Sequence, residues 1–124
     1  MSNFHDLKVW QKAHELTLAV YRATSKFPRE EIYGLVAQMR RCAVSVGSNI
    51  AEGRGRDGDV EFARFLAIAL GSLTELEYQL LLSRDLGYIG DSEHEKLNVS
   101  VAEVNRMLLG LQVSVKKAAA RAGR

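Results

Sequence analysis

Hydrophobic residues recur along this chain at alternating steps of three and four positions, in four separate segments. Steps of three and four keep side chains on one face of an α-helix, and no segment shows the sustained period-two alternation of a β-strand. The pattern therefore predicts four amphipathic helices and an all-α fold. The positions are Val9, Ala13, Leu16, Val20, Ala23 and Phe27; Leu35, Met39, Cys42 and Val46, continued by Asn49; Phe62, Leu66, Ala69, Leu73, Leu76 and Leu80; and Leu97, Val101, Val104, Leu108, Leu111 and Val115.

Helix-breaking residues separate the four segments. Pro28 follows the first segment and disfavours helical geometry in the residue before it. Glycine-rich stretches at 53–58 and 87–91 separate the later segments, with a left-handed cap expected at the first glycine of the second stretch. Ser92 and Glu95 match a capping box, which predicts that the fourth helix starts there.

Connections this short place consecutive helices side by side and antiparallel. The sequence therefore predicts an up-down-up-down antiparallel four-helix bundle. We expect one domain, residues 1–118, followed by a short basic C-terminal tail, residues 119–124, that is disordered.

Composition is typical of a soluble domain. The chain has 124 residues, of which 47% are hydrophobic and 26% charged, and a net charge of +2. Its single cysteine, Cys42, fits a reducing compartment and is expected to be a buried structural thiol. No run approaches the roughly 18 uncharged apolar residues of a membrane span, and the N-terminus lacks the apolar run of a secretory signal. We expect a cytoplasmic protein with no membrane partner.

The basic residues are unevenly distributed. One group lies in the middle of the chain, and another ends it in a stretch without any acid, whereas the acids gather at other positions such as 57–61 and 75–77. Basic clusters of this kind contact nucleic-acid phosphates, or they keep a helix end soluble. The candidate nucleic-acid-binding residues are Arg40, Arg41, Arg54, Arg56, Lys116, Lys117 and Arg121.

Motifs for catalysis, metals and cofactors are missing. Di-metal centres in helical bundles use Glu-x-x-His pairs, and the sequence contains none. Residues 53–58 match G-x-G-x-x-G, but this motif binds dinucleotides only between a strand and a helix. We therefore expect no catalytic residue, no metal, no cofactor and no small-molecule substrate, and the protein is predicted not to be an enzyme.

Hydrophobic residues outside the main seams favour self-association. The third and fourth segments carry additional apolar residues, and glycines inside the helices permit close backbone approach. The alternative is a monomer that is somewhat over-hydrophobic. Trp10 and Tyr21 are interpreted as core or interface aromatics rather than stacking platforms. The extra positions are Phe65, Ile68, Leu70, Leu81, Leu82, Met107, Leu109 and Val113, and the glycines are Gly34, Gly47, Gly71 and Gly110.

Three sequence blocks, in this order and spacing, resemble the bacterial four-helix-bundle proteins encoded within intervening sequences of 23S ribosomal RNA genes. The resemblance extends from about Phe4 to Val115. The blocks are Phe4-x-x-Leu7-x-Val9-Trp10-Gln11-Lys12-Ala13; Gln38-x-x-Arg41 followed by Ser45-x-x-Ser48-Asn49-Ile50-Ala51-Glu52-Gly53; and Phe62-x-x-Phe65-Leu66-x-Ile68-Ala69-x-Gly71-Ser72-x-x-Glu75.

The resemblance implies a cytoplasmic bundle that assembles as a ring-shaped homopentamer. It also implies kinship with the accessory variability determinants of diversity-generating retroelements, which are basic pentamers that bind nucleic acid. Our leading hypothesis is a non-catalytic oligomeric bundle that binds structured RNA or DNA through a basic surface. The alternative is a self-assembling protein–protein interaction scaffold with no nucleic-acid role. Basic residues on a shared face favour the first hypothesis, and basic residues scattered among acids favour the second.

Overall fold

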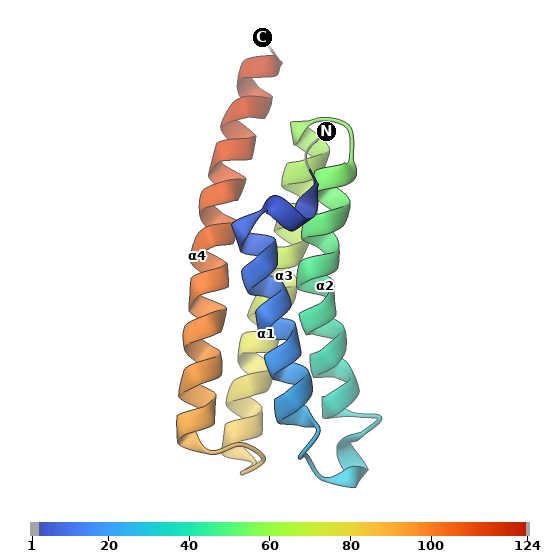
Figure 1. Ribbon diagram of the computed structural model, residues 1–124, viewed down its shortest axis with the longest axis vertical. Coiled ribbons are helices and arrows are strands. Elements are labelled where there is room, and N and C mark those ends of the chain that lie inside the picture. Colours follow the sequence, from blue (N-terminus) through green and yellow to red (C-terminus); the bar gives the residue numbers. More distant parts are fainter. Residues whose placement is uncertain (1–2, 124) are drawn as a thin grey trace.

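The computed structural model describes residues 3–123 and confirms the all-α four-helix bundle (Figure 1). Consecutive long helices run in opposite directions, so the C-terminal ends of α2 and α4 lie at the same end of the bundle as the start of α1. The described residues contain no strand. The elements are the 3-10 helix η1 (Phe4–Asp6), α1 (Lys8–Thr24), the 3-10 helix η2 (Arg29–Glu31), α2 (Leu35–Gly55), α3 (Asp59–Asp85) and α4 (Asp91–Ala122).

The predicted seams form the core. All of their positions are buried except Asn49 and Leu111, which are half-buried. Near the end of α2 the core position is taken by Ile50, which is fully buried, one position beyond Asn49. The central leucines of α3 and α4, among them Leu73 and Leu108, are fully buried, and each contributes about 1.5–3 kcal/mol through removal from water.

The α3 C-terminus ends in the predicted left-handed glycine. Gly87 has a φ of 80°. Its N–H donates to the carbonyl of Arg84, and the N–H of Tyr88 donates to the carbonyl of Ser83, both at 2.9 Å. These two bonds are those of a Schellman motif, which satisfies carbonyls that the helix itself leaves unpaired. The ring of Tyr88 then packs 5.2 Å from the ring of Phe27.

The start of α4 differs from the predicted capping box. The helix begins at Asp91, its N-cap is Gly90, and no side chain caps it. Ser92 therefore lies inside the first turn. The preceding Ile89 is buried in the core, so the chain turns into the helix earlier than a capping serine at position 92 would require.

The C-terminal part of α4 extends beyond the rest of the bundle (Figure 1). With 32 residues α4 is about 48 Å long, whereas α1 has 17 residues. The helix continues to Ala122, so residues 119–122, which we expected in a disordered tail, are helical in this structure. Arg124, the last residue of the expected tail, lies outside the described residues.

Helix α3 is the most apolar element. Among the described residues it is the one helix whose length and composition would suit a membrane span, with a mean hydropathy of 1.3 over its most apolar window. The central helix of a bundle core has the same composition, and α3 contributes Leu66, Leu73, Leu76 and Leu80 to this core. Composition alone is therefore weak evidence for a membrane location.

Glycine allows α2 and α3 to approach closely near their connection. A Cβ added to Gly53 would lie 2.7 Å from Cβ of Phe65 and 3.0 Å from Cδ1 of Phe62, closer than side-chain contacts allow. Gly71, in the middle of α3, has no neighbouring atom within 4 Å of the same position. Gly53 is therefore needed for the close approach of α2 and α3, whereas Gly71 is not needed for packing within the bundle.

We predict that Gly53→Ala and Gly71→Ala change stability in opposite directions. Gly71→Ala gains about 1 kcal/mol in the free energy of unfolding, because alanine is the better helix former and nothing opposes its methyl group. Gly53→Ala loses about 1–3 kcal/mol, because its methyl overpacks two buried phenylalanines. Urea unfolding followed by circular dichroism measures both. Equal shifts in the two variants would show that the α2–α3 approach does not depend on Gly53.

Candidate nucleic-acid interface

Arg40 is held against α1. Its Nε donates to the hydroxyl of Thr24 at 2.9 Å, and its Nη2 donates to the carbonyl of Tyr21 at 3.2 Å. The guanidinium carbon lies 4.5 Å from the centre of the Tyr21 ring. These partners fix the orientation of Arg40 without neutralising its charge, so the cation is preorganised at the α1–α2 surface.

Arg41 lies on the other side of α2, at a polar cleft between α2 and α3. The cleft has a volume of about 420 Å³. It unites residues from the second and third sequence blocks, which are far apart in the chain. Among the described residues Arg41 forms no ion pair, although Glu75 lines the same cleft. The lining residues are Gln38, Arg41, Cys42 and Ser45 from α2, and Ser72 and Glu75 from α3.

Hydrogen bonds join the two walls of this α2–α3 cleft. The hydroxyls of Ser45 and Ser72 lie 2.8 Å apart, and the side-chain amide of Asn49 donates to the carbonyl of Ser45 at 2.8 Å. Below them Gln79 is buried, and its Nε2 lies 3.5 Å from Sγ of Cys42. The cleft is therefore polar, with a buried thiol on its inner wall.

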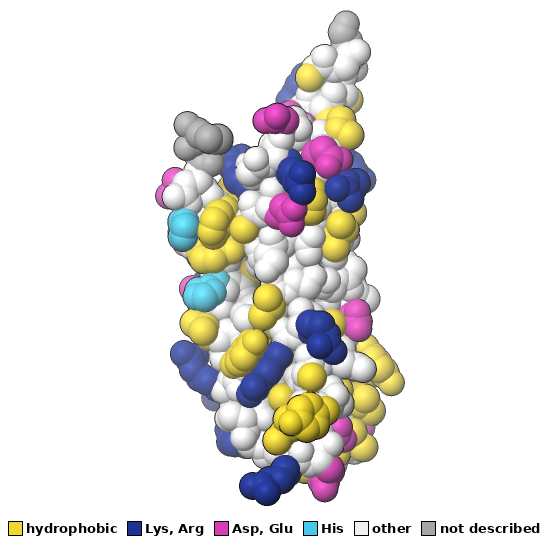
Figure 2. All heavy atoms as spheres, turned by 90° about the vertical axis from the view of Figure 1, so that its right-hand side faces the viewer, with side chains coloured by type: hydrophobic (Ala, Val, Ile, Leu, Met, Phe, Trp, Pro, Cys, Tyr) yellow, Lys and Arg dark blue, Asp and Glu magenta, His cyan; other side chains and the backbone are white. Residues whose placement is uncertain are grey.

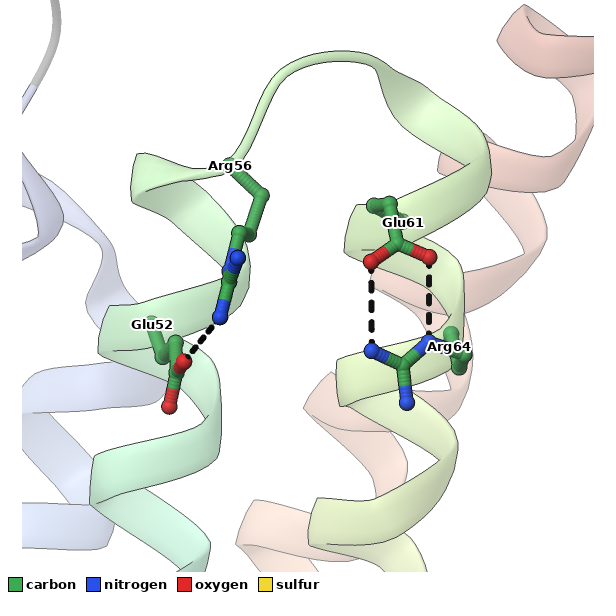
Figure 3. A network of polar contacts seen from close by, with 4 residues as sticks. All are labelled: Glu52, Arg56, Glu61 and Arg64. Carbon is green, nitrogen blue, oxygen red and sulfur yellow. Dashed lines mark hydrogen bonds and ion pairs between the residues drawn. The ribbon is translucent and has the colours of Figure 1, made fainter.

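Two arginines near the α2–α3 connection are paired with acids (Figure 3), and both also lie over an aromatic ring. Arg56 pairs with Glu52, one turn earlier on α2. Arg64 pairs with Glu61 through two bonds, Nε–Oε2 at 3.0 Å and Nη2–Oε1 at 3.1 Å, and the hydrogen bonding lowers the pKa of Glu61. The guanidiniums of Arg56 and Arg64 lie 5.2 and 4.6 Å from the ring centre of Phe65. Arg56 is thus largely neutralised within the fold.

Arg54 lies at the same end and is half-buried. Its guanidinium carbon is 5.9 Å from the ring centre of Phe62. Packing against a core phenylalanine ties this side chain to the α2–α3 contact, so it presents less of its guanidinium to solvent than a loop arginine would.

The cations near the C-terminal end of α4 differ from these arginines in the absence of a neighbouring acid in the sequence. After Glu103 the sequence contains no further acid. Lys116, Lys117 and Arg121 are exposed, and within residues 3–123 none of them forms an ion pair. Steps of 11 and then 4 residues place Arg106, Lys117 and Arg121 on one helix face. We call the segment from Val104 to Ala122 the basic arm.

A second, mostly apolar groove runs between α1 and α2, with a volume of about 350 Å³. Figure 2 shows two histidine side chains beside hydrophobic ones at the left edge of the view, with lysine and arginine side chains interspersed among hydrophobic ones below them. The groove is lined by Phe4, Trp10, His14, Thr17, Val44, Gly47, Ser48 and Ala51.

The structure does not gather the seven predicted site residues into one patch. Lys116, Lys117 and Arg121 lie on the basic arm, at the same end of the bundle as Arg54 and Arg56 (Figure 1). Arg40 and Arg41 lie 14 and 13 positions before Arg54 on α2, which is about 20 Å along the helix. The sequence analysis missed the groove residue His14, although the line Trp10, His14, Thr17 and Tyr21 has helical spacing and could have indicated it.

Within residues 3–123 no group of three or more histidine, cysteine, aspartate or glutamate side chains is placed to hold a metal ion.

Fold and surface together define a small, four-helix-bundle protein with a basic helical arm and polar and apolar clefts between its helices. A family model described as 23S rRNA-intervening sequence protein matches residues 5–110. The chain belongs to this family.

A solved structure supports the same fold. It is the crystal structure of a protein of unknown function from the S23 ribosomal protein family of Bacteroides thetaiotaomicron. The two chains share 26% sequence identity and superpose with a TM-score of 0.76, over 84% of this chain and 97% of the other. No curated protein matches the chain.

We predict that Cys42 reacts slowly with iodoacetamide in the folded protein. Burial raises the pKa of its thiol, so a smaller fraction is the reactive thiolate at pH 8 than in the unfolded chain, and the same burial limits access. Mass spectrometry of timed samples, with and without urea, gives the two rates. Equal rates would mean that the α2–α3 cleft exposes the thiol.

Proposed function

We propose that this protein is a non-catalytic, oligomeric, cytoplasmic protein that binds structured RNA or DNA through phosphate contacts made by the basic arm. The observation that carries the proposal is the arm itself. Four exposed cations, Arg106, Lys116, Lys117 and Arg121, follow the last acid of the chain. They lie on α4, which contains no acid after Glu103 and whose C-terminal part continues past its neighbours (Figure 1).

Counterion release is the physical basis of such binding. Each phosphate neutralised by a lysine or arginine releases condensed cations, and affinity falls linearly with salt on logarithmic axes. Contacts of this kind position a nucleic acid and carry little sequence information. A helical arm also holds its cations at fixed spacing, so less conformational freedom is lost on binding than from a flexible tail.

In this proposal the arginines of the bundle contribute less to binding than the basic arm does. Arg40 and Arg41 supply one further basic position on each side of α2, and neither forms an ion pair with a described residue. Arg54 and Arg56 contribute less to binding, since one packs on Phe62 and the other pairs with Glu52.

The names of the family and of one solved relative support this proposal. The family description refers to 23S rRNA, and the solved relative carries the name of a ribosomal protein family. The resemblance also implies a homopentamer and kinship with nucleic-acid-binding accessory variability determinants. Five copies of the basic arm in one ring would bind one polyanion multivalently, which raises avidity without new contacts.

We predict that Lys117→Ala with Arg121→Ala weakens binding to a fluorescent RNA hairpin and makes it less salt-dependent. Two lost phosphate contacts reduce the slope of log K against log salt by about 2 per chain. Fluorescence anisotropy between 50 and 200 mM KCl measures the slope.

The matched control for this experiment removes the same charge elsewhere. Arg29→Ala with Lys96→Ala neutralises two exposed cations outside the basic arm. Equal slopes in the two double variants would exclude the arm as the binding surface, and no binding by the wild type at 50 mM salt would overturn the proposed function for this class of RNA.

The scaffold alternative is favoured by apolar side chains that the bundle leaves in solvent. Leu109 and Val113 of α4 are 45% and 51% exposed, and Gly110 between them has open space above it. A second protein chain, or another copy of this one, would bury such a surface.

We predict that Leu109→Asp with Val113→Asp dissociates the oligomer while the helices remain folded. Placing two carboxylates in an apolar interface costs more than the interface gains. The control is Val60→Asp with Val99→Asp, whose side chains are 72% and 59% exposed on other surfaces. Analytical ultracentrifugation reports the mass. Assembly that is lost together with RNA affinity supports the nucleic-acid proposal, and assembly in a protein that never binds RNA supports the scaffold.

A further inference from the structure

Ring side chains line the α1 wall of the α1–α2 groove. Trp10, His14 and Tyr21 follow each other at steps of four and seven residues, so they share one face of α1. Phe4 of η1 extends the line at the upper end of the groove. The upper part of the wall, from Phe4 to His14, is therefore aromatic, and Tyr21 continues the same helix face one turn beyond the lining residue Thr17.

The rings at the upper end form a stacked cluster. The planes of Trp10 and His14 are inclined by only 6°, with ring centres 5.1 Å apart. Phe4 meets Trp10 edge to face at 4.8 Å, and His5 stacks on Phe4 at 4.1 Å. His14 is exposed. The stack thus ends on a solvent-accessible ring that a further planar group can continue.

Small residues of α2 lie opposite these rings, so the side chains of α2 do not fill the groove. The hydroxyl of Thr17 donates to the carbonyl of Ala43 at 3.1 Å, which joins the floor of the groove to α2. Gly47 faces Trp10, and a Cβ placed there would lie 3.6 Å from Nε1 of the indole. That distance is an ordinary contact, so the glycine is not needed for packing and instead leaves the groove open.

The charged residue Arg40 lies one turn before the lining residue Val44 on α2, so it adjoins the lower end of the groove. Among the described residues that line it, none is acidic, whereas Glu75 lines the α2–α3 cleft and Glu77 lines a cleft between α3 and α4. Arg40 covers Tyr21, farther along the same side of α1, with its guanidinium held by Thr24 and the Tyr21 carbonyl. An anionic ligand with a planar, apolar part matches this combination better than an apolar peptide, which would leave Arg40 without an anionic partner.

We propose that the α1–α2 groove binds unpaired nucleotides of the RNA or DNA, with a base stacked on the Trp10–His14 pair and the backbone phosphate near Arg40. This inference rests on the proposed function, because it assigns to the groove the unpaired segments of the nucleic acid that the basic arm binds. Stacking on aromatic rings tolerates every base, so the groove selects single-stranded structure rather than sequence. It also gives Trp10 a role beyond packing.

The chain contains one tryptophan, so its intrinsic fluorescence reports directly on the groove. The full-length protein is titrated with oligo(U) of 12 nucleotides and, separately, with a fully paired RNA duplex. We expect oligo(U) to quench Trp10 and the duplex to bind without quenching. Oligo(dT) in place of oligo(U) distinguishes RNA from DNA.

Two variants test the groove without disturbing the core. His14→Ala removes the exposed ring of the stack, and Gly47→Met fills the groove with a flexible side chain. Loss of one stacked base weakens binding by about 5- to 150-fold, so both variants should lose oligo(U) affinity to about that extent and keep their affinity for the duplex. The control is Tyr78→Ala, which removes an exposed ring from α3 and should change neither affinity.

The outcomes separate this inference from the proposed function. Duplex binding with no quenching by oligo(U), or with oligo(U) affinity unchanged in both variants, overturns the groove assignment and leaves the basic arm intact. No binding of either RNA overturns the proposed function and the groove together. A change of oligomeric mass in Gly47→Met, with oligo(U) affinity preserved, would assign the groove to an apolar segment of another copy and would likewise overturn the inference.

Discussion

The packing of α2 against α3 is the interaction on which the rest of the structure depends. Sparse polar contacts connect the two helices in antiparallel order: the hydroxyl of Ser83 donates to the sulfur of Met39 at 3.4 Å, Gln79 contacts Cys42, and Ser72 bonds Ser45. Gly53 continues this order at the end of α2, against Phe62 and Phe65. A shift of one helix along the other would break these contacts and place a larger residue than Gly53 against the two phenylalanines, so the contacts favour this register.

This register also decides what the arginines can do. It brings Arg56 and Arg64 together over Phe65, each with its own acid, and it sets Arg54 on Phe62. Exposed pairs of this kind stabilise a fold only modestly, but they occupy guanidiniums that would otherwise meet a ligand. Among the candidate residues, the cations not paired with an acid within residues 3–123 include those of the basic arm and, at the two surfaces of α2, Arg40 and Arg41.

The basic arm and the upper opening of the α1–α2 groove lie at the same end of the bundle. Trp10 lies near the start of α1, and the arm rises at the same end of the bundle because α1 and α4 run in opposite directions (Figure 1). A nucleic acid bound along the arm would therefore pass close to the upper opening of the groove. Paired and unpaired segments of one structured molecule would then meet different surfaces, the first electrostatic and the second aromatic.

Local periodicity explains how much of the fold the sequence predicted. The four seams, the all-α class and the glycine cap at Gly87 follow from helical spacing and backbone preference, which act within a few residues, and the structure confirms them. The predicted start of α4 was wrong, because the burial of Ile89 outweighed the local capping pattern at Ser92. The same competition placed Ile50 rather than Asn49 at the buried position of α2.

The candidate sites depended on tertiary structure. The sequence identified the basic residues, but it did not indicate which of them are available to a ligand, since charge is a property of each residue alone. An ion pair requires two side chains that reach each other across a helix turn or between helices. In the structure Arg56 is paired with an acid, whereas Lys117 forms no ion pair with a described residue. The sequence by itself therefore determined the helices, the helix faces that form the core, and which residues carry a positive charge. Only the packing of α1 and α2 decided that Trp10, His14 and Gly47 share a groove, because a groove exists only where two helices meet.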